Sequence, residues 1–463
     1  MHWHCEPPDT SPSTHPGGTE PHSQGRQHLM ARDWRTNDVV IVGCGLSGLT
    51  AGLFLLRRGY GVTILERRSS YGGLCGTFEM DGREFVIACN DFGQGLVRTL
   101  EELGVPLRFK SKKTRIFYGD RVYELPLSAG TALRLAPHMR ALARFFLGLR
   151  RARRAGEGTR SLGEFVDSTV GRCEAGDLLK LPAYLMGVRP EDFQLHSLWD
   201  EFQYDYGYSK PATPVGGPQV LADTLANRFL AGGGTILLST ECRNVHTDGD
   251  GYTLDTSAGE LRARAVLSTA ERTDPALPGS KPGLPVSMFC VAVSKELPYP
   301  EEIHTLVHYP PGISDWFGKL DSGVPSSEFG FHLFRSELPE KPDHYTLNIY
   351  FYLPRGVEEP EGAYVQQAED YIFSHAERML PGLGKAILYK RFVSPRMFSQ
   401  RHGLSSRVTP LITGPGIPKA DNHDAGTGLY YAGNSVFPPG DHAGAAILSA
   451  RISAGLIANR LSP

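Results

Sequence analysis

A glycine-rich segment near the start of the chain is the part whose residue types and spacing most clearly specify chemistry. It reads Gly43-Cys44-Gly45-Leu46-Ser47-Gly48, the spacing G-x-G-x-x-G. Gly43 permits a tight turn, Gly45 lets a pyrophosphate approach the main chain, and Gly48 lets a helix pack closely on a strand. The first amide groups of that helix then face the phosphates. The segment predicts a dinucleotide site that includes Leu46 and Ser47.

The elements that must position this loop are present on both sides of it. Asp38–Val42 is a β-branched run that predicts a strand, and Leu49–Arg58 predicts a helix. A second predicted strand, Gly61–Leu65, ends in Glu66, whose carboxylate can accept hydrogen bonds from both ribose hydroxyls. Arg67 and Arg68 follow directly, either as phosphate contacts or as solvated side chains.

A pair of glycines a few residues later distinguishes the candidate dinucleotides. Gly72 and Gly73 form a second flexible main-chain element, with Leu74 after it, where an extended FAD can pass. A simple NAD domain would continue with regular βαβ units instead. No second G-x-G-x-x-G occurs in the chain. We therefore predict FAD as the only dinucleotide.

The carboxyl-terminal segment has the composition of a second cofactor-binding element. Gly428–Asn434 predicts a strand that ends in a tight turn, and a loop over Pro438–His442 follows. Ala443–Leu461 is small and apolar and predicts one long helix. Its first residues leave room for a planar ring, and they are Ala443, Gly444 and Ala445.

Together these segments resemble the amine oxidase and phytoene desaturase superfamily of flavoproteins, with the nearest likeness to carotenoid isomerases and retinol-saturase-like enzymes. The resemblance implies that the last helix points its N-terminus at the N1–C2=O edge of the flavin and that Gly433 and Asn434 contact the cofactor. It also implies that Cys242 lends its main chain to the adenine, with an ordinary strand cysteine as the alternative. The chain departs from the family at Asn434, where an acid is usual, and at Phe85–Ala88, which lacks an acid and a glycine.

The fold class expected is α/β, with an α+β substrate part: a Rossmann-type FAD-binding domain interleaved with a discontinuous mixed-sheet substrate domain and a helical cap. We predict that residues 1–37 form a disordered tail. The FAD-binding domain is expected in three pieces, over residues 38–106, 213–284 and 394–463. The substrate domain is expected in two pieces, over residues 107–212 and 285–393.

Two stretches of the substrate part have a marked apolar pattern. Residues 131–154 predict one amphipathic helix, which either lies on an anionic membrane surface or is a cap helix with solvated arginines. Its apolar stripe is Leu135, Met139, Leu142, Phe146 and Leu149, and its outlying arginines are Arg140, Arg144, Arg151 and Arg154. Residues 344–352 predict a strand. Its apolar face lines a pocket or belongs to the core, and consists of Tyr345, Leu347, Ile349 and Phe351.

The catalytic candidates are His442, as an acid, base or polar contact, and Asp441, which could orient it. The alternative is an N-cap at Asp441 with His442 in the first helical turn. Lys319 is a candidate for the water-holding lysine of amine oxidases. The expected function is FAD-dependent oxidation or desaturation of a hydrophobic small molecule by hydride transfer to flavin N5. A flavin amine oxidase, a redox-neutral polyene isomerase and a non-catalytic flavin-binding protein are the alternatives.

Composition limits the partners. The chain has 463 residues, 40% hydrophobic and 21% charged, which is typical of a globular protein. Its net charge of −2 gives no basic excess for nucleic acid. Seven scattered cysteines indicate a reducing compartment and no metal site. The uncharged stretch Val39–Leu56 is as long as a membrane span, but its glycines favour a strand-to-helix switch. We expect a cytoplasmic protein, with peripheral membrane contact through 131–154 as an option.

Overall fold

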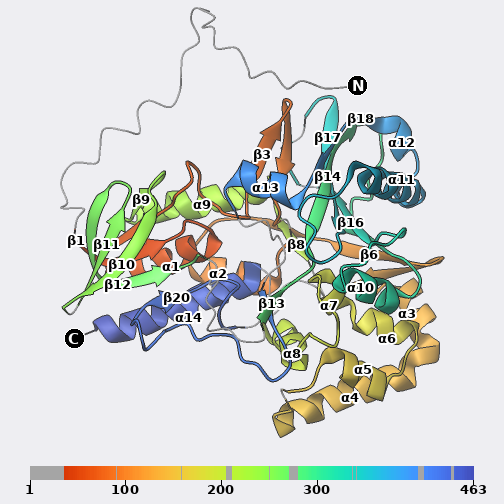
Figure 1. Cartoon of the computed structure of the whole chain (residues 1–463), viewed down its shortest axis with the longest axis horizontal. Coiled ribbons are helices and arrows are strands. Elements are labelled where there is room, and N and C mark those ends of the chain that lie inside the picture. The colour runs from red at the N-terminus through yellow and green to blue at the C-terminus, as the bar shows by residue number, and fades with distance from the viewer. Residues whose placement is uncertain are drawn as a thin grey trace, which may run out of the picture.

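A computed structural model describes residues 36–89, 91–157, 159–204, 211–249, 251–270, 280–335, 337–339, 341–404, 411–438 and 443–462. The predicted tail therefore lies almost wholly outside the described residues, and so do Asp441 and His442. The described chain forms two large sheets that lie side by side, with helices around each (Figure 1). This is the α/β fold class that the sequence predicts.

The first sheet contains the predicted nucleotide-binding strands. Its order is β10 (Cys242–Asp248), β11 (Gly251–Thr256), β12 (Gly259–Ser268), β1 (Thr36–Val42), β2 (Val62–Leu65) and β9 (Thr235–Leu237), and β20 (Tyr430–Tyr431) pairs with β12. The strands β12, β1, β2 and β9 are parallel, as a Rossmann-type unit requires, whereas β10 and β11 join antiparallel. Strands from three distant stretches thus share one sheet. The predicted domain boundaries themselves remain a prediction.

Four helices cover this sheet, and they are α1 (Leu46–Leu56), α2 (Gln94–Glu102), α9 (Pro218–Ala231) and α14 (Ala443–Leu461). The first helix and the last one contact each other (Figure 1), and small buried side chains such as Ala450 and Ala454 allow this close approach. The uncharged stretch 39–56 thus forms β1 and α1. Among the described residues, no helix combines the length and the apolar character that crossing a bilayer requires.

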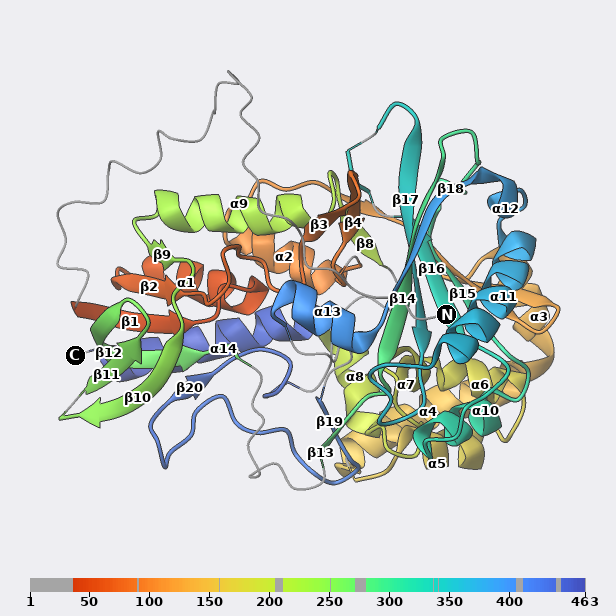
Figure 2. The same ribbon diagram turned by 45° about the horizontal axis from the view of Figure 1, so that its top comes forward.

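The second sheet has the order β18 (Ile387–Val393), β14 (Val286–Ser294), β17 (His344–Tyr352), β16 (Phe331–Arg335), β15 (Ile303–Tyr309), β6 (Lys113–Tyr118) and β7 (Arg121–Leu125). Only β15 and β6 are parallel neighbours among these pairs. Helices α11 (Gly362–Met379) and α12 (Leu383–Ala386) cover its outer face (Figure 2). Leu347, Ile349 and Phe351 are buried in that layer, so the predicted apolar face of β17 belongs mainly to the core.

A helical layer lies at the far end of the second sheet (Figure 1) and consists of α3 (Ala129–Leu135), α4 (Met139–Ala155), α5 (Leu162–Thr169), α6 (Glu174–Leu179), α7 (Leu181–Leu185), α8 (Leu195–Tyr204) and α10 (Ile313–Asp321). The prediction of one helix over 131–154 was wrong. A 3₁₀ turn at Ala136–His138 separates α3 from α4, because Pro137 lacks the amide that would continue the α-helical ladder.

The break changes which apolar side chains are inside. Phe145, outside the predicted stripe, is fully buried, whereas Met139 and Phe146 are exposed. Short pairs of strands and one further helix complete the described chain: β3 (Thr77–Met80) with β4 (Arg83–Val86), β5 (Phe109–Ser111) with β8 (Ala212–Pro214), β13 (Ser280–Pro282) with β19 (Leu411–Thr413), and α13 (Pro395–His402).

Candidate functional site

A cavity of about 1290 Å³ extends between the two sheets. Most of the predicted cofactor-binding residues line one end of it, which we call the nucleotide end. They are Gly43, Gly45, Leu46, Ser47, Glu66, Arg67, Gly72, Gly73, Leu74, Cys242, Gly433, Asn434 and Ala443. The fold thus gathers stretches that lie up to four hundred positions apart along one wall. Their individual contacts with a cofactor remain predictions.

Glycine is needed at the three positions of the first loop for different physical reasons. Gly43 has φ +104°, and a Cβ there would lie 2.3 Å from Thr269 Oγ1. A Cβ at Gly48 would lie 2.0 Å from the carbonyl oxygen of Gly43. A Cβ at Gly45 would meet only Gly73 Cα, at 3.9 Å, and would point into the cavity. The protein itself therefore requires Gly43 and Gly48, while the space at Gly45 is left for a ligand.

Gly48 does not line the cavity, and its contact with a cofactor stays a prediction. Its role is to let α1 begin directly against the preceding turn, as the 2.0 Å separation shows.

The double glycine is packed directly on the first loop. The amide of Gly72 donates to the carbonyl of Cys44 at 2.8 Å, and Gly72 and Gly45 form an isolated bridge. Gly72 has φ +100°, and a Cβ there would come within 2.4 Å of the Cys75 carbonyl oxygen. The two flexible main-chain elements predicted from the sequence therefore form one continuous wall.

Glu66 is buried and holds this wall together. Its Oε2 accepts a hydrogen bond from the Cys44 amide at 2.9 Å, and its Oε1 accepts one from the Arg68 amide at 3.0 Å. Each carboxylate oxygen retains acceptor capacity for a ribose hydroxyl. Burial, with the nearby Glu66 charge, raises the pKa of the Cys44 thiol to about 12. Cys44 therefore stays protonated and is not a nucleophile.

Arg68 and Thr269 also line the nucleotide end. The sequence marks Arg68, with Arg67, as a phosphate contact or a solvated side chain, whereas no sequence pattern indicates Thr269. Arg68 Nη1 donates to the Gly73 carbonyl at 3.3 Å, whereas Arg67 Nη2 donates to the carbonyl of Gly403. Thr269 Oγ1 donates to the Val42 carbonyl at 3.0 Å. Arg68 could be named from the sequence, because it lies two residues after Glu66. Thr269 could not, because it lies more than two hundred positions from the loop that it supports.

The start of α14 closes the nucleotide end, although not through all the residues predicted. Ala443 and Ala446 line the cavity, because residues three apart share one helix face. Gly444 and Ala445 are buried and do not line it, and their contacts with a cofactor stay predictions. Small side chains on the cavity face leave room for a planar ring, which fits the cofactor that the sequence predicts.

The strand that departs from the family pattern is held by its neighbour β17. Asn348 Nδ2 donates to the Val86 carbonyl at 3.1 Å, and Tyr350 Oη lies 3.3 Å from the carbonyls of Ile87 and Ala88. Ala88 lines the cavity with its neighbour Cys89. This segment lacks the acid and the glycine that are usual in the family, and hydrogen bonds from β17 side chains hold its main chain in place.

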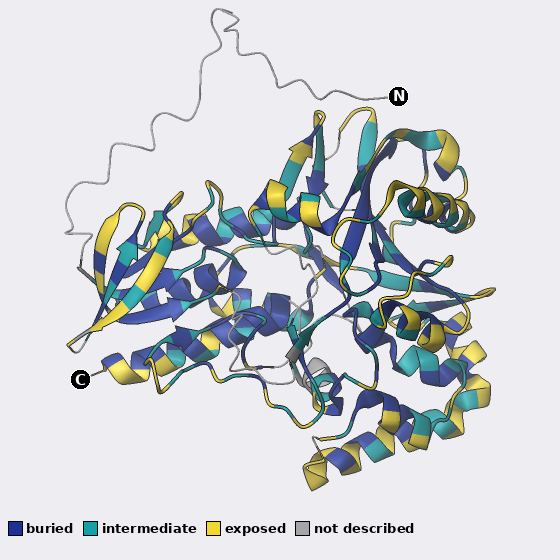
Figure 3. Cartoon of the chain, in the orientation of Figure 1, coloured by how far each residue is buried: buried dark blue, intermediate teal, exposed yellow. Residues whose placement is uncertain are grey.

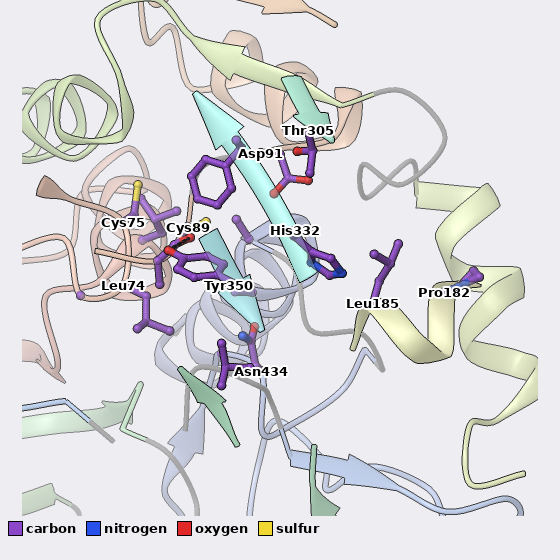
Figure 4. A pocket seen from close by; sticks show the side chains of 18 of the residues that line it. Leu74, Cys75, Cys89, Asp91, Pro182, Leu185, Thr305, His332, Tyr350 and Asn434 are labelled. Carbon is purple, nitrogen blue, oxygen red and sulfur yellow. Dashed lines mark hydrogen bonds between the residues drawn. The ribbon is translucent and has the colours of Figure 1, made fainter. Parts of the chain in front are cut away.

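The other end of the cavity, which we call the substrate end, is mainly apolar. Side chains of the second sheet face it from one side and those of α7 from the other, as His332, Tyr350, Pro182 and Leu185 show in Figure 4. Its apolar and aromatic lining includes Ile116, Tyr123, Leu125, Leu127, Leu135, Leu142, Phe145, Phe146, Leu178, Leu179, Leu181, Leu185, Val286, Val307, Phe334, Tyr350, Phe351 and Tyr352.

Charged groups are few at the substrate end. Among the described lining residues there is no lysine, and Asp91 is the one carboxylate away from the nucleotide end. Lys319 lies on α10 and does not line the cavity, so its prediction as a flavin-side lysine is wrong for the described structure. The roles of Asp441 and His442 stay predictions, because both lie outside the described residues.

His332 is a polar residue of the substrate end that no sequence motif indicates. Its Nε2 lies 2.9 Å from Tyr309 Oη, and Tyr352 Oη donates to the Tyr184 carbonyl at 2.7 Å beside it. The rings of His332 and Tyr352 meet edge to face. Burial lowers the pKa of His332 to about 4, so the imidazole is neutral at neutral pH. A neutral imidazole can donate or accept one hydrogen bond toward a ligand.

Comparison with known proteins identifies the family. A model of the family described as flavin containing amine oxidoreductase matches residues 46–458. The chain belongs to this family. As a flavin containing amine oxidoreductase it is an FAD-dependent oxidoreductase, and the cavity fits that cofactor: Gly45 leaves space, Glu66 offers acceptors and Ala443 leaves room for a ring.

Solved structures of two oxidases and an oxidoreductase share the fold. Wild-type putrescine oxidase bound to putrescine superposes with a TM-score of 0.62 at 17% identity over 92% of this chain and 99% of that one. Cyclohexylamine oxidase from Brevibacterium oxydans gives 0.62 at 14% identity, covering 92% and 99%. An oxidoreductase from Methanosarcina mazei gives 0.63 at 15% identity, covering 89% and 99%. At such identities the likeness concerns the fold alone.

Curated relatives match this flavin containing amine oxidoreductase only over short segments. The inactive all-trans-retinol 13,14-reductase of Danio rerio is 48% identical over 48 residues, which are 10% of this chain and 8% of that protein. Thiamine thiazole synthase of Metallosphaera sedula is 40% identical over 76 residues, 16% of this chain and 26% of that protein. Neither match therefore assigns a substrate.

Proposed function

We propose that this chain uses FAD to oxidise, by desaturation or a related hydride removal, an uncharged and hydrophobic small molecule. One observation carries the proposal: the cavity continues from the nucleotide end into a large space with an apolar and aromatic lining. Ligand pockets usually occupy about 300–1,000 Å³. A cavity of about 1290 Å³ leaves space for a bulky substrate beside the cofactor.

The charges of the lining favour a neutral substrate over an amine. An ammonium group loses its hydration in an apolar space, and this loss is costly unless a counter-charge lies close. The substrate end offers Asp91 alone among its described carboxylates, and Asp91 is exposed rather than buried. An apolar molecule loses no such hydration there and gains from leaving water.

When bound, FAD supplies the hydride acceptor of the reaction. The chain's own residues supply position and surroundings. The start of α14 stabilises negative charge near Ala443 by about 0.3–1 kcal/mol. His332 offers a neutral hydrogen-bonding group, and the side chains of α7 and the second sheet exclude water from the reacting atoms.

Anaerobic reduction of the FAD-loaded protein tests this proposal. Candidate apolar substrates, such as polyenes, and primary amines are mixed with it, and the loss of the visible flavin absorption is followed. We expect reduction by an apolar substrate and none by amines. Reduction by amines alone would refute the proposal in favour of an amine oxidase.

A cavity-filling variant with a matched control locates the substrate. Leu185→Trp narrows the substrate end, whereas Leu388→Trp adds the same side chain at an exposed position of β18. We expect at least about a tenfold slower reduction in Leu185→Trp, unchanged flavin content in both variants, and a normal rate in the control. Equal rates would place the substrate elsewhere.

A further inference from the structure

We propose that the surface formed by α3, α4 and the segment before them docks on an anionic lipid bilayer. We call it the 127–154 surface, and its apolar members are Leu127, Leu133, Met139, Phe146 and Leu147, while its arginines are Arg134, Arg140, Arg144, Arg150, Arg151, Arg153 and Arg154. The proposal of membrane docking depends only on the structure of this surface. The use of the surface in substrate delivery rests on the proposed function.

Exposed apolar side chains concentrate on this surface. Leu127, Leu133 and Leu147 are 61%, 76% and 55% exposed, and Met139 and Phe146 are exposed as well. The other large apolar side chains exposed in the described chain are scattered over separate elements: Leu230, Leu238, Val324, Leu388, Phe437 and Leu456. A cluster of exposed apolar groups marks an interaction site, whereas single ones are ordinary. Figure 3 shows the exposed residues of α4 along the outer edge of the molecule.

The charge of the same surface has one sign. Residues 125–156 contain seven arginines and no Asp or Glu. Two of the arginines are held within the chain, because Arg134 donates to the Val122 carbonyl and Arg153 stacks on Trp199. The others are exposed, and within the described residues they form no ion pair: Arg140, Arg144, Arg150, Arg151 and Arg154. An anionic surface matches this arrangement, because each exposed arginine is attracted to negatively charged lipid headgroups.

The apolar part of the surface decides between a bilayer and a nucleic acid. A phosphate backbone matches the arginines but has no use for Leu133, Met139 and Leu147 beside them. A helix that lies in the membrane interface uses both kinds of residue, with its apolar side chains among the acyl chains and its arginines at the headgroups. The 127–154 surface has this combination.

The surface is also continuous with the substrate end of the cavity. Leu127 and Phe146 are exposed, and both line the cavity. The buried Phe145 and half-buried Leu142 line it directly behind them. An apolar molecule that leaves a bilayer at this surface therefore reaches the substrate end along side chains that are themselves apolar, without crossing water.

Vesicle binding tests the surface without using the reaction. The FAD-loaded full chain is sedimented with vesicles of equimolar phosphatidylcholine and phosphatidylglycerol, and with vesicles of phosphatidylcholine alone. The test variant is the pair Leu133→Glu and Leu147→Glu, neither of which lines the cavity. The matched control is Leu230→Glu with Leu388→Glu, which are 48% and 52% exposed on other elements.

We expect the wild type and the control to bind the anionic vesicles, and the test variant to bind at least about tenfold more weakly. Added salt should weaken the binding, and neutral vesicles should bind less. Equal binding of the test variant and the control, no vesicle binding at all, or retention on DNA but not on vesicles would each overturn the proposal.

Flavin reduction by a detergent-dispersed substrate separates the two proposals. A test variant that loses vesicle binding but keeps the wild-type rate supports docking as a delivery step. Vesicle binding by a wild type whose flavin no apolar substrate reduces would refute the proposed function and leave the docking surface supported.

Discussion

Replacing Gly45 by valine should remove FAD while leaving the fold in place. The structure gives the reason, because a Cβ at Gly45 meets nothing closer than Gly73 Cα at 3.9 Å and points into the cavity. The backbone there has φ −80° and ψ −174°, which valine adopts readily. Loss of glycine at this N-cap position costs the apoprotein about 1 kcal/mol. The new methyl groups occupy the space through which a pyrophosphate would approach.

Gly48→Ala is the matched comparison and should behave in the opposite way. Its Cβ would lie 2.0 Å from the Gly43 carbonyl oxygen, so α1 must shift, at a cost of about 1–3 kcal/mol or more in the apoprotein. Thermal unfolding with and without FAD measures both effects. FAD at a hundred times its dissociation constant stabilises a protein by about 2.7 kcal/mol, and we expect Gly45→Val to lose this increment. A yellow Gly45→Val protein with a normal FAD-dependent shift would refute the reasoning.

Three further predictions concern the cavity lining. Glu66→Ala should be purified depleted of flavin and less stable by about 1–3 kcal/mol, because the Cys44 and Arg68 amides lose their acceptor; normal flavin content would count against the ribose role. His332→Ala should raise KM more than it lowers kcat, since the imidazole orients the substrate, and an unchanged KM would contradict this. The folded pKa of His332, about 4, lies below its ordinary value of 6.5, so the stability that depends on its neutral form is full above pH 6.5 and falls toward pH 4. The unfolding free energy of His332→Asn should therefore decline less over that window, by up to about 3 kcal/mol, and an identical slope would exclude His332 as the cause.

The nucleotide end could be predicted from the sequence because its rules are local. The turn at Gly43, the packing at Gly48 and the acid at Glu66 each follow from a few neighbouring residues, and the structure places them around the parallel neighbours β1 and β2. Helix periodicity also gave the bounds of α14 correctly. It did not show which of its first residues face the cavity, because that depends on how α14 packs against α1.

The substrate end could not be predicted in the same way. His332, Tyr350 and Leu185 come from three elements that only the tertiary fold brings together, and no spacing in the chain relates them. The prediction of one helix over 131–154 was wrong for a local reason that the sequence does show, namely Pro137. The break at this proline changes the helical phase, so Phe145 is buried in the core and Phe146 is exposed.

The pairing of α14 with α1 also has a consequence for biosynthesis. The ribosome completes β1 and the glycine loop first, yet the wall formed by Ala443 and Ala446 emerges about four hundred residues later. The apolar flank of α1 that contacts α14 therefore lacks this partner until α14 has been synthesised. We expect the cofactor to be held only once α14 is in place, so a ribosome-stalled chain without α14 should not retain the flavin.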